Sequence, residues 1–227
     1  MKSALSQAMG ATWYPHLHAF NFLPSRLLHP SWQPRFSPQD CITALAPQLA
    51  EVDLHRHWSA YILDLLGLAD QPCLDPLARG LSMAILPRGA FERLVELTGA
   101  VLLGRALRRV IRREDVIVLN SALRPEVLAY ARQTGAARHP GLEWDDAIDV
   151  QTLVTKIFPL GAATVLDALR GAPDAVFERV RLRLPADTPV GTLAGESGAA
   201  DFDSLELLWH LVADLEPQWL SSYPSRH

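Results

Sequence analysis

The sequence predicts a mainly α fold: a single irregular multi-helix bundle with a proline-rich, aromatic N-terminal arm and at most one short strand near residues 179–184. Apolar residues recur at helical spacing through most of the chain, and helix-start signatures precede several of these stretches. Only residues 179–184 alternate strictly between charged and apolar side chains, as a strand does. Because one strand cannot form a sheet alone, helices are expected to build the core.

Composition bounds the class of protein. The 227 residues are 49% hydrophobic and 20% charged, which is typical of a globular protein and excludes wholesale disorder. A net charge of -4 gives no overall basic field that would attract nucleic acid. Cys41 and Cys73 lack CxxC spacing, which favours ordinary thiols in a reducing compartment. Residues 1–10 lack an apolar core of signal-peptide length, and no apolar run suffices to span a membrane, so a cytosolic protein without membrane insertion is predicted.

Residues 1–36 are predicted to form an arm that packs on the body. Four prolines divide it, which argues against a long helix and favours an extended arm with short turns: Pro15, Pro24, Pro30 and Pro34. Its rings are expected to pack on the body, namely Trp13, Tyr14, Phe20, Phe22, Trp32 and Phe36. An exposed aromatic arm that docks on a partner is the alternative.

Residues 37–184 are predicted to form a helical body, followed by a linker at 185–200 and a C-terminal amphipathic helix and tail at 201–227. Helix starts are expected at Ser37-Pro38, Pro47, Asp75-Pro76 and Arg124-Pro125, and two further helices at 145–157 and 160–169. The helix from Pro47 is expected to end at Gly67 and to place one apolar face inward: Leu54, Trp58, Tyr61, Ile62 and Leu65.

Within residues 81–113 one predicted helix changes character. Its apolar face from Phe91 to Leu102 is continued along the chain by a set of arginines: Arg105, Arg108, Arg109, Arg112 and Arg113. The helix either carries these arginines into solvent or bends near Gly104. The arginines are either a solvated helix end, where cations gain from the helix dipole, or a surface that docks an acidic protein, since guanidinium groups match carboxylates in bidentate geometry.

The C-terminal helix poses the same choice. Asp203 and Glu206 form a capping pair at its start, and apolar residues are predicted to share one face: Leu205, Leu208, Trp209, Val212 and Leu215. This face either packs on its own domain or serves a partner's groove.

Motifs for catalysis and phosphate binding are absent in their full form. Gly99 to Gly104 has the glycine spacing of a phosphate-binding loop, but arginine replaces the lysine, alanine replaces Ser/Thr, and the interior is apolar and helical. Gly195-Glu196-Ser197-Gly198 resembles a nucleophile elbow, but Ala199 takes the place of the last glycine and no strand precedes it.

Metal sites are disfavoured as well. His55 and His57 lie two apart on a predicted helix and so point to different faces, while His16 and His18 would share a side only in an extended segment. Glu143, Asp145, Asp146 and Asp149 form an acidic patch around Trp144, which a helix start explains. We therefore predict no catalytic residue, no metal and no cofactor.

Three segments resemble the YscK-like family, whose members are the K component of the bacterial type III secretion apparatus: Leu81–Pro87, Leu97–Arg109 and Val180–Pro189. This family typically shows a leucine-rich helix containing a glycine followed by paired arginines, and a late "Leu-x-Leu-Arg-Leu-Pro" signature before a loop. Here Arg181-Leu182-Arg183-Leu184-Pro185 stands in that place. The arm from Phe20 to Phe36 is also similar in style, whereas residues 135–149 and the C-terminal helix depart from the family.

The resemblance implies a non-enzymatic cytoplasmic adaptor of the sorting platform, peripheral at the inner membrane and required for assembly and secretion. It would link the cytosolic domain of the inner-membrane ring protein to the pod protein of the ATPase-bearing complex. The charge and apolar patterns predict the partner-binding residues: Arg105, Arg108, Arg109, Arg112, Arg113, Leu205, Leu208, Trp209 and Val212.

Two other functions stay open. One is a helical small-molecule-binding protein or hydrolase whose site is assembled from distant polar residues: His55, Glu143, Asp146 and His210. The other is a secretion chaperone that binds an exported protein.

Overall fold

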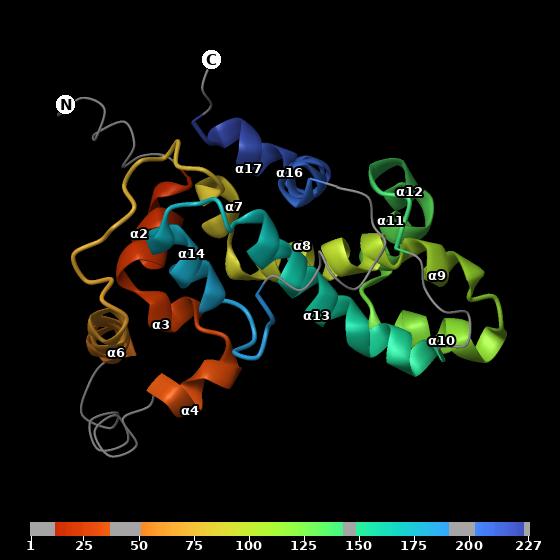
Figure 1. The fold of residues 1–227 in the computed structure, drawn as a ribbon, viewed down its shortest axis with the longest axis horizontal. Coiled ribbons are helices and arrows are strands. Elements are labelled where there is room, and N and C mark those ends of the chain that lie inside the picture. The colour runs from red at the N-terminus through yellow and green to blue at the C-terminus, as the bar shows by residue number, and fades with distance from the viewer. Residues whose placement is uncertain (1–11, 37–50, 143–148, 191–202, 225–227) are drawn as a thin grey trace. The chain divides into compact units, whose positions relative to one another are not determined.

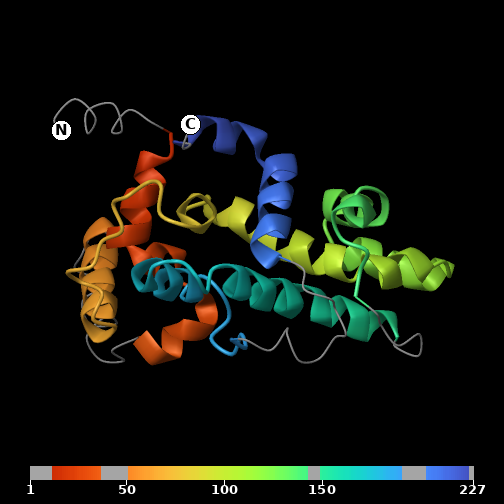
Figure 2. The same ribbon diagram turned by 45° about the horizontal axis from the view of Figure 1, so that its top comes forward.

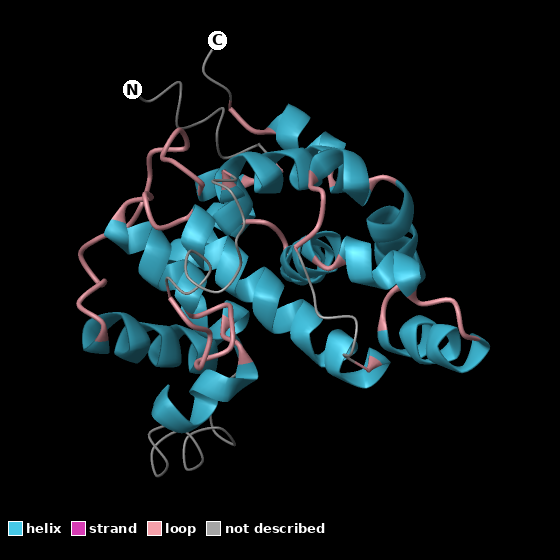
Figure 3. Ribbon diagram, turned by 45° about the vertical axis from the view of Figure 1, so that its right-hand side comes forward, coloured by secondary structure: helices cyan, strands magenta, loops and turns pink. Residues whose placement is uncertain are grey.

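The computed structural model describes residues 12–36, 51–142, 149–190 and 203–224. Every regular element in these ranges is a helix, and no strand occurs among them (Figure 3). The predicted mainly α fold is therefore confirmed. The chain divides into two compact units: unit 1 comprises residues 1–88, 171–187 and 218–227, and unit 2 comprises residues 89–170 and 188–217.

Unit 1 is built from one longer helix and several short helices beside it (Figure 1). Its described helices are α2 (Tyr14–Phe22), α3 (Pro24–Leu27), η1 (Pro30–Trp32), α4 (Gln33–Phe36), α6 (Glu51–Leu65), α7 (Leu81–Ala84), α14 (Asp174–Arg181) and α17 (Pro217–Ser222), whose first residue belongs to unit 2.

In the described part of the N-terminal segment, residues 12–36, the chain forms short helices, so the prediction of an extended arm was wrong there. Pro15, Pro24 and Pro30 each stand in the first turn of a short helix, where the missing N–H has no intrahelical partner to lose. The prolines therefore divide the segment into short helices. Phe22 is exposed, but most of the aromatic rings of this segment are buried, namely Trp13, Phe20, Trp32 and Phe36.

Residues 179–184 form the end of α14 and a turn, so the short strand that the alternation allowed does not form. Arg179 lies in α14 and Arg183 in the turn that follows it, and both are buried. Arg179 Nη2 donates to Leu68 O at 3.0 Å, and Arg183 donates to the carbonyls of Ala84 and Leu86 at the end of α7. The alternation thus reflects buried arginines that satisfy main-chain carbonyls.

The same segment sits in the core of unit 1. Leu182 packs in a cluster with Leu28, Trp32, Phe36 and Ile62. The carbonyl of Leu182 accepts from His29 N at 2.8 Å, and that of Leu184 accepts from Trp32 Nε1 at 2.8 Å. The Leu-Arg-Leu-Pro signature of the resemblance therefore has a structural role here.

Two local predictions in unit 1 have different outcomes. Gly67 does end α6: it adopts a φ of 66°, and Leu68 N donates back to Leu63 O at 2.8 Å. By contrast, Asp75 starts a turn, because its carboxylate accepts from Leu77 N at 2.9 Å, and the helix begins only at α7. The predicted starts at Ser37 and Pro47 lie outside the described residues.

Other predictions concern side chains of the same unit. The inward face of α6 is Ser59, Ile62 and Leu63, while Tyr61 and Leu65 are exposed, so the predicted face was partly wrong. Cys73 is a buried free thiol, as expected; Cys41 lies outside the described residues.

Unit 2 contains two long helices with shorter helices beside them (Figure 1). Its described helices are α8 (Arg88–Leu102), whose first residue belongs to unit 1, α9 (Gly104–Arg109), α10 (Arg113–Ala122), α11 (Pro125–Gln133), α12 (Gly135–Arg138), α13 (Val150–Ala168) and α16 (Ser204–Leu215). The predicted helix start at Arg124-Pro125 is confirmed by α11.

A single helix, α13, replaces the two helices predicted at 145–157 and 160–169. Asp149 caps it, accepting from Thr152 N at 3.0 Å. Pro159 stands inside the helix but on its exposed side, where water can satisfy the carbonyl that the missing N–H leaves free. A proline on the solvent face therefore did not break this helix.

Helices α8 and α13 cross backbone to backbone at two glycines. A Cβ atom on Gly99 would lie 1.8 Å from Ile157 O, and one on Gly161 would lie 1.9 Å from Val95 O. On α8, Val95 supplies the carbonyl that faces Gly161, and Gly99 lies four residues later. On α13, Ile157 supplies the carbonyl that faces Gly99, and Gly161 lies four residues later. The contact is therefore reciprocal. Only hydrogen at both positions allows this approach.

Replacing Arg183 should destabilise unit 1. We expect Arg183→Lys to lower the free energy of unfolding by about 2 kcal/mol, because an ammonium group cannot reproduce the fork that reaches two buried carbonyls. Urea unfolding followed by tryptophan fluorescence measures the change. The control is Arg181→Lys at the more exposed last residue of α14, expected within about 0.5 kcal/mol of wild type. Equal midpoints for the two variants would contradict the role of Arg183.

Adding a methyl group at the α8–α13 crossing should destabilise unit 2. We expect Gly99→Ala or Gly161→Ala to cost about 3 kcal/mol, because the obstructing atoms belong to the backbone of the facing helix. The matched control is Gly89→Ala in the first turn of α8. Its added Cβ would meet nothing closer than Arg93 Nη1 at 3.7 Å, so it should be neutral or stabilise by up to about 1 kcal/mol. Thermal unfolding of the three variants checks this, and an unchanged melting temperature for both crossing variants would refute it.

Candidate interaction surfaces

The helix that begins at Arg88 bends where the sequence analysis allowed a bend. Helix α8 ends at Leu102, Leu103 leaves the helical conformation with φ −91° and ψ 8°, and α9 begins at Gly104. Leu102 O accepts from Leu142 N at 2.7 Å, so a distant segment satisfies the carbonyl at the break. Of the two alternatives, the bend is the one observed.

The predicted arginines lie on two helices, which we call together the arginine corner: Arg105, Arg108, Arg109, Arg112 and Arg113. Helix α9 ends at Arg109, residues 110–112 form an extended link, and α10 begins at Arg113. All five side chains are exposed. The helix dipole favours cations at the end of α9 but disfavours them at the start of α10, so it cannot explain the whole set.

The corner is held in place from α11, which contacts α9 (Figure 2). Arg132 Nη2 donates to Leu107 O at 3.1 Å and to Val110 O at 3.0 Å. These are carbonyls at the end of α9, which have no intrahelical donor. A side chain outside the corner thus fixes the direction in which the chain leaves α9.

The apolar stripe predicted on the C-terminal helix is only partly exposed. Asp203 caps α16 as predicted, accepting from Leu205 N at 2.9 Å and Glu206 N at 3.2 Å. Leu208 and Val212 are buried, in a helix that packs on α13 within unit 2. These two of the four residues predicted on this helix to bind a partner are therefore covered within unit 2. Leu205 is half-buried, and Trp209 is 41% exposed.

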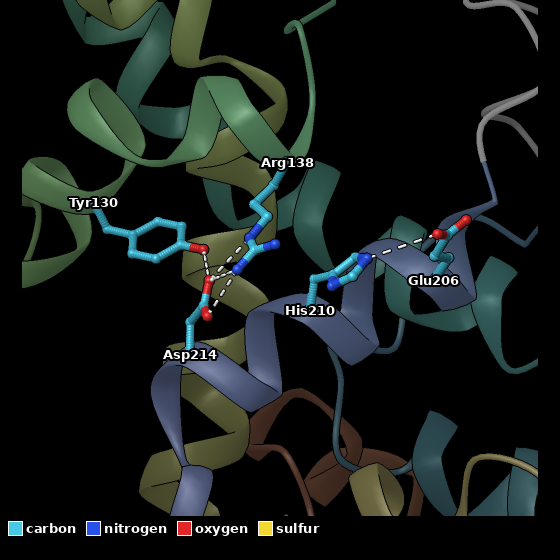
Figure 4. Close-up of polar contacts among 5 residues, drawn as sticks. All are labelled: Tyr130, Arg138, Glu206, His210 and Asp214. Carbon is cyan, nitrogen blue, oxygen red and sulfur yellow. Dashed lines mark hydrogen bonds and ion pairs between the residues drawn. The ribbon is translucent and has the colours of Figure 1, made fainter.

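A polar network joins α11, α12 and α16 (Figure 4). Asp214 of α16 accepts from Tyr130 Oη at 2.5 Å and from both Nε and Nη2 of Arg138, at 3.0 and 2.8 Å to the same oxygen. Sequence reasoning missed this site, because the three residues are far apart in the chain and no spacing relates them.

Burial and the hydrogen bond to Asp214 raise the pKa of Tyr130 to about 12. Burial alone would raise the pKa of Asp214, but the hydrogen bonds from Tyr130 and Arg138 outweigh it and hold that pKa below its ordinary value. The network therefore favours the charge states that prevail near neutral pH.

A pocket of about 360 Å³ lies beside this network, between α12 and the start of α16. It is lined by Ala137, Arg138, His139, Asp203, Glu206, Leu207 and His210. His139 Nδ1 accepts from Gly141 N at 3.0 Å, and His210 lies 3.6 Å from Glu206 on the exposed side of α16. With Arg138 committed to Asp214 and Asp203 to the helix cap, the lining groups support local structure, and none is Ser, Thr or Cys.

The residues suggested for an assembled enzyme site are divided between the units or lie outside the described residues. His55 belongs to unit 1 and His210 to unit 2, while Glu143, Asp146 and the segment 195–198 are not described. His55 Nδ1 does lie 2.8 Å from Ser25 Oγ, an arrangement that the sequence did not reveal. Ser25 is buried, and its hydroxyl also contacts Ser59 Oγ and His55 O, so this group connects α3 to α6.

Three further findings concern metal binding, phosphate binding and membrane spanning. Among the described residues, no three His, Cys, Asp or Glu side chains gather as metal ligands would, and His16 and His18 lie on α2. The glycine-spaced segment is helical from Gly99 to Leu102, the chain leaves the helical conformation at Leu103, and Gly104 begins α9. None of the described helices combines the length and apolar character that crossing a bilayer requires.

Comparison with known families gives one match. The family described as YOP proteins translocation protein K (YscK) matches residues 16–207 of the 227. The match includes all three segments on which the resemblance to the YscK-like family was based, and that identification is confirmed. Neither a search of curated proteins nor a search of solved structures gave a significant match.

Removing the Tyr130 hydroxyl tests the network. We expect Tyr130→Phe to lower the free energy of unfolding by about 1 to 2 kcal/mol near neutral pH, because a hydrogen bond to a carboxylate is lost. Tyr61→Phe is the control, since Tyr61 is exposed on α6, and should change stability by less than about 0.5 kcal/mol.

The network also has a predicted pH dependence. Because the folded-state pKa of Asp214 is lowered, its contribution is present above the unfolded-state pKa of about 3.9 and is lost as the pH falls through the folded-state value. The pKa of Tyr130 is raised, so the contribution of Tyr130 to stability is present below about pH 10 and is lost as the pH rises through about 12. The stability difference between wild type and Asp214→Asn should therefore shrink in acid. A difference that stays constant down to the acid limit of folding would rule out this linkage.

Proposed function

Because this chain belongs to the YscK family, described as YOP proteins translocation protein K, we propose that it serves bacterial type III secretion as a non-enzymatic adaptor. In this proposal it joins the cytosolic domain of the inner-membrane ring protein to the pod protein of the ATPase-bearing sorting platform. It acts in the cytoplasm at the inner membrane, without entering the bilayer or binding nucleic acid, and assembly and secretion require it.

The family match carries this proposal, and the arginine corner supports it with a surface that suits a protein partner. Five exposed guanidinium groups stand within nine residues of a chain whose net charge is -4, and Arg132 fixes the end of the helix that bears three of them. A fixed positive patch on an acidic protein suits an acidic protein surface, since guanidinium groups bind carboxylates in bidentate geometry. The patch is less suited to a polyanion such as nucleic acid, because the net negative charge of the rest of the chain repels the polyanion.

An adaptor needs a second surface, and the outer face of α16 supports one. Trp209 is 41% exposed beside the half-buried Leu205, and the buried Leu208 and Val212 anchor the helix from within unit 2. Tryptophan is enriched among residues that dominate protein interfaces. We assign Trp209 to this surface and the arginine corner to the other.

Absence of enzymatic activity is part of the proposal. Support comes from the pocket beside α16, where Arg138, His139 and Asp203 are each engaged in local hydrogen bonds. The buried Ser25 pairs with His55 between two helices, which suits a structural contact better than a nucleophile that substrate must reach. The chaperone alternative differs in its partner, an exported protein.

Co-isolation from cells that express the secretion apparatus tests the proposal. Tagged wild-type chain, gently cross-linked, should recover both the ring protein and the pod protein. Arg108→Glu with Arg112→Glu should lose one of the two partners, at least tenfold by quantitative mass spectrometry, with helical circular dichroism and melting temperature unchanged.

The matched control is Arg26→Glu, a charge reversal of an exposed arginine in unit 1, which should retain both partners. Recovery of neither partner by the wild-type chain would reject the adaptor function. Recovery of an exported protein alone would favour the chaperone. If both partners persist in the double variant, the adaptor reading stands and the arginine corner is excluded as its site.

A further inference from the structure

We propose that the arginine corner binds an acidic, amphipathic segment of a protein partner, and that apolar side chains of this segment seat on Ile111 and Ile117. This inference rests on the proposed function and specifies the chemistry of one partner. It adds an apolar centre to a surface that the sequence analysis described by charge alone.

Ile111 is the central observation. It lies in the link between α9 and α10 and is 83% exposed, more than any other exposed large hydrophobic residue in the described part of the chain. A link at a protein surface is ordinarily polar, or contains glycine or proline. A β-branched apolar side chain exposed at such a tip adds little to folding, and it leaves an apolar surface that a partner can cover.

Ile117 is a second exposed apolar side chain, on the adjoining helix α10. It is 57% exposed and follows Arg113 by four residues, so the two side chains share one face of the helix. Arg108 and Arg109 precede Ile111 in the chain, and Arg112 and Arg113 follow it. An apolar centre within a charged rim is the usual anatomy of a protein interface.

The corner is ordered before any partner arrives. Arg132 donates to Leu107 O and Val110 O, immediately before Ile111. Leu142 N donates to Leu102 O and fixes the other end of the short helix α9. A surface held in this way loses little conformational entropy on binding.

The local charges favour a protein segment over a lipid surface or a nucleic acid. Glu114 and Asp115 stand in the first turn of α10, directly after Arg113. A uniformly anionic surface is repelled by these carboxylates, whereas a protein segment can place acids against the arginines and donors against Glu114 and Asp115. An amphipathic helix with acids beside its apolar face supplies both requirements.

Photo-cross-linking in cells tests which molecule covers the corner. A benzophenone amino acid is introduced at position 111, and, as control, at position 74 in unit 1, where Leu74 is 60% exposed. Position 111 should give an adduct whose partner peptide, sequenced by mass spectrometry, is acidic with apolar residues at helical spacing. Position 74 should not give that adduct.

The adduct decides between the occupants. An adduct with lipid or nucleic acid, or with a peptide that is neutral or basic, overturns the proposal. If co-isolation recovers the secretion partners and position 111 gives no adduct, the adaptor function stands and this inference fails. If co-isolation fails, the proposed function falls on its own test.

A synthetic peptide with the cross-linked sequence then separates the apolar and charged parts of the site. Ile111→Ser should weaken binding about tenfold while leaving the salt dependence of affinity as in wild type, because an uncharged contact is lost. Arg112→Gln should weaken binding and also flatten the salt dependence.

The control variant for this titration is Leu74→Ser, which removes an exposed apolar side chain from unit 1 and should bind as wild type. Vesicles of phosphatidylglycerol and phosphatidylethanolamine provide the competing surface. If Ile111→Ser binds the peptide with unchanged affinity, the arginine corner is a purely electrostatic site and the proposed apolar contact at Ile111 is wrong. Binding to vesicles that Ile111→Ser abolishes, with no binding to the peptide, would assign the corner to the membrane instead.

Discussion

The backbone contact between α8 and α13 is the constraint from which unit 2 is built. With Gly99 against Ile157 O and Gly161 against Val95 O, no side chain separates the two helices at their crossing. Close approach of this kind maximises dispersion contact between main chains, and it holds the helices at one register because neighbouring residues are too large to take the glycines' place. The end of α8 at Leu102 is thereby fixed three residues beyond Gly99, which determines where the chain bends and where α9 begins.

Arginine performs two opposite tasks in this chain, and its sequence context does not distinguish them. Arg179, Arg183 and Arg132 donate to main-chain carbonyls at helix ends or turns, where a planar fork can reach two acceptors. The members of the arginine corner face solvent. The internal arginines order the elements, and Arg132 orders the corner itself. A charge count alone would have treated all of them as one class of surface cation.

The features that could be predicted from sequence are those that depend on local interactions. Helix caps such as Asp203, the stop at Gly67 and the start at Pro125 follow from the backbone groups at helix ends. Predictions failed where tertiary partners decide. Residues 179–184 alternate because two arginines are buried, and α13 continues through Pro159 because that residue faces solvent.

The candidate site shows the same division. The arginines could be predicted from the sequence because their charge is a property of the residue type. Ile111 could not be predicted, because the sequence does not show which apolar side chains are exposed. On α16 the predicted stripe included Trp209, which lies about 100° around the helix from Leu208. Once Leu207 and Leu211 define the buried side, Trp209 falls outside it. Apolar spacing therefore located the helix correctly but not the boundary between its packed face and its exposed face.

These contacts explain how the proposed surface at the arginine corner could bind a partner specifically. Specificity at a protein surface requires groups of fixed position more than groups of unusual reactivity, because rigid placement lowers the entropic cost of binding and raises the cost of a mismatched partner. The glycine crossing fixes α8, Leu142 N satisfies its last carbonyl, and Arg132 satisfies the end of α9. Each of these contacts fixes the position of the next segment, from the core of unit 2 to Ile111 and the arginine corner. A mutation at Gly99 or Arg132 would therefore impair recognition without altering any residue that touches the partner.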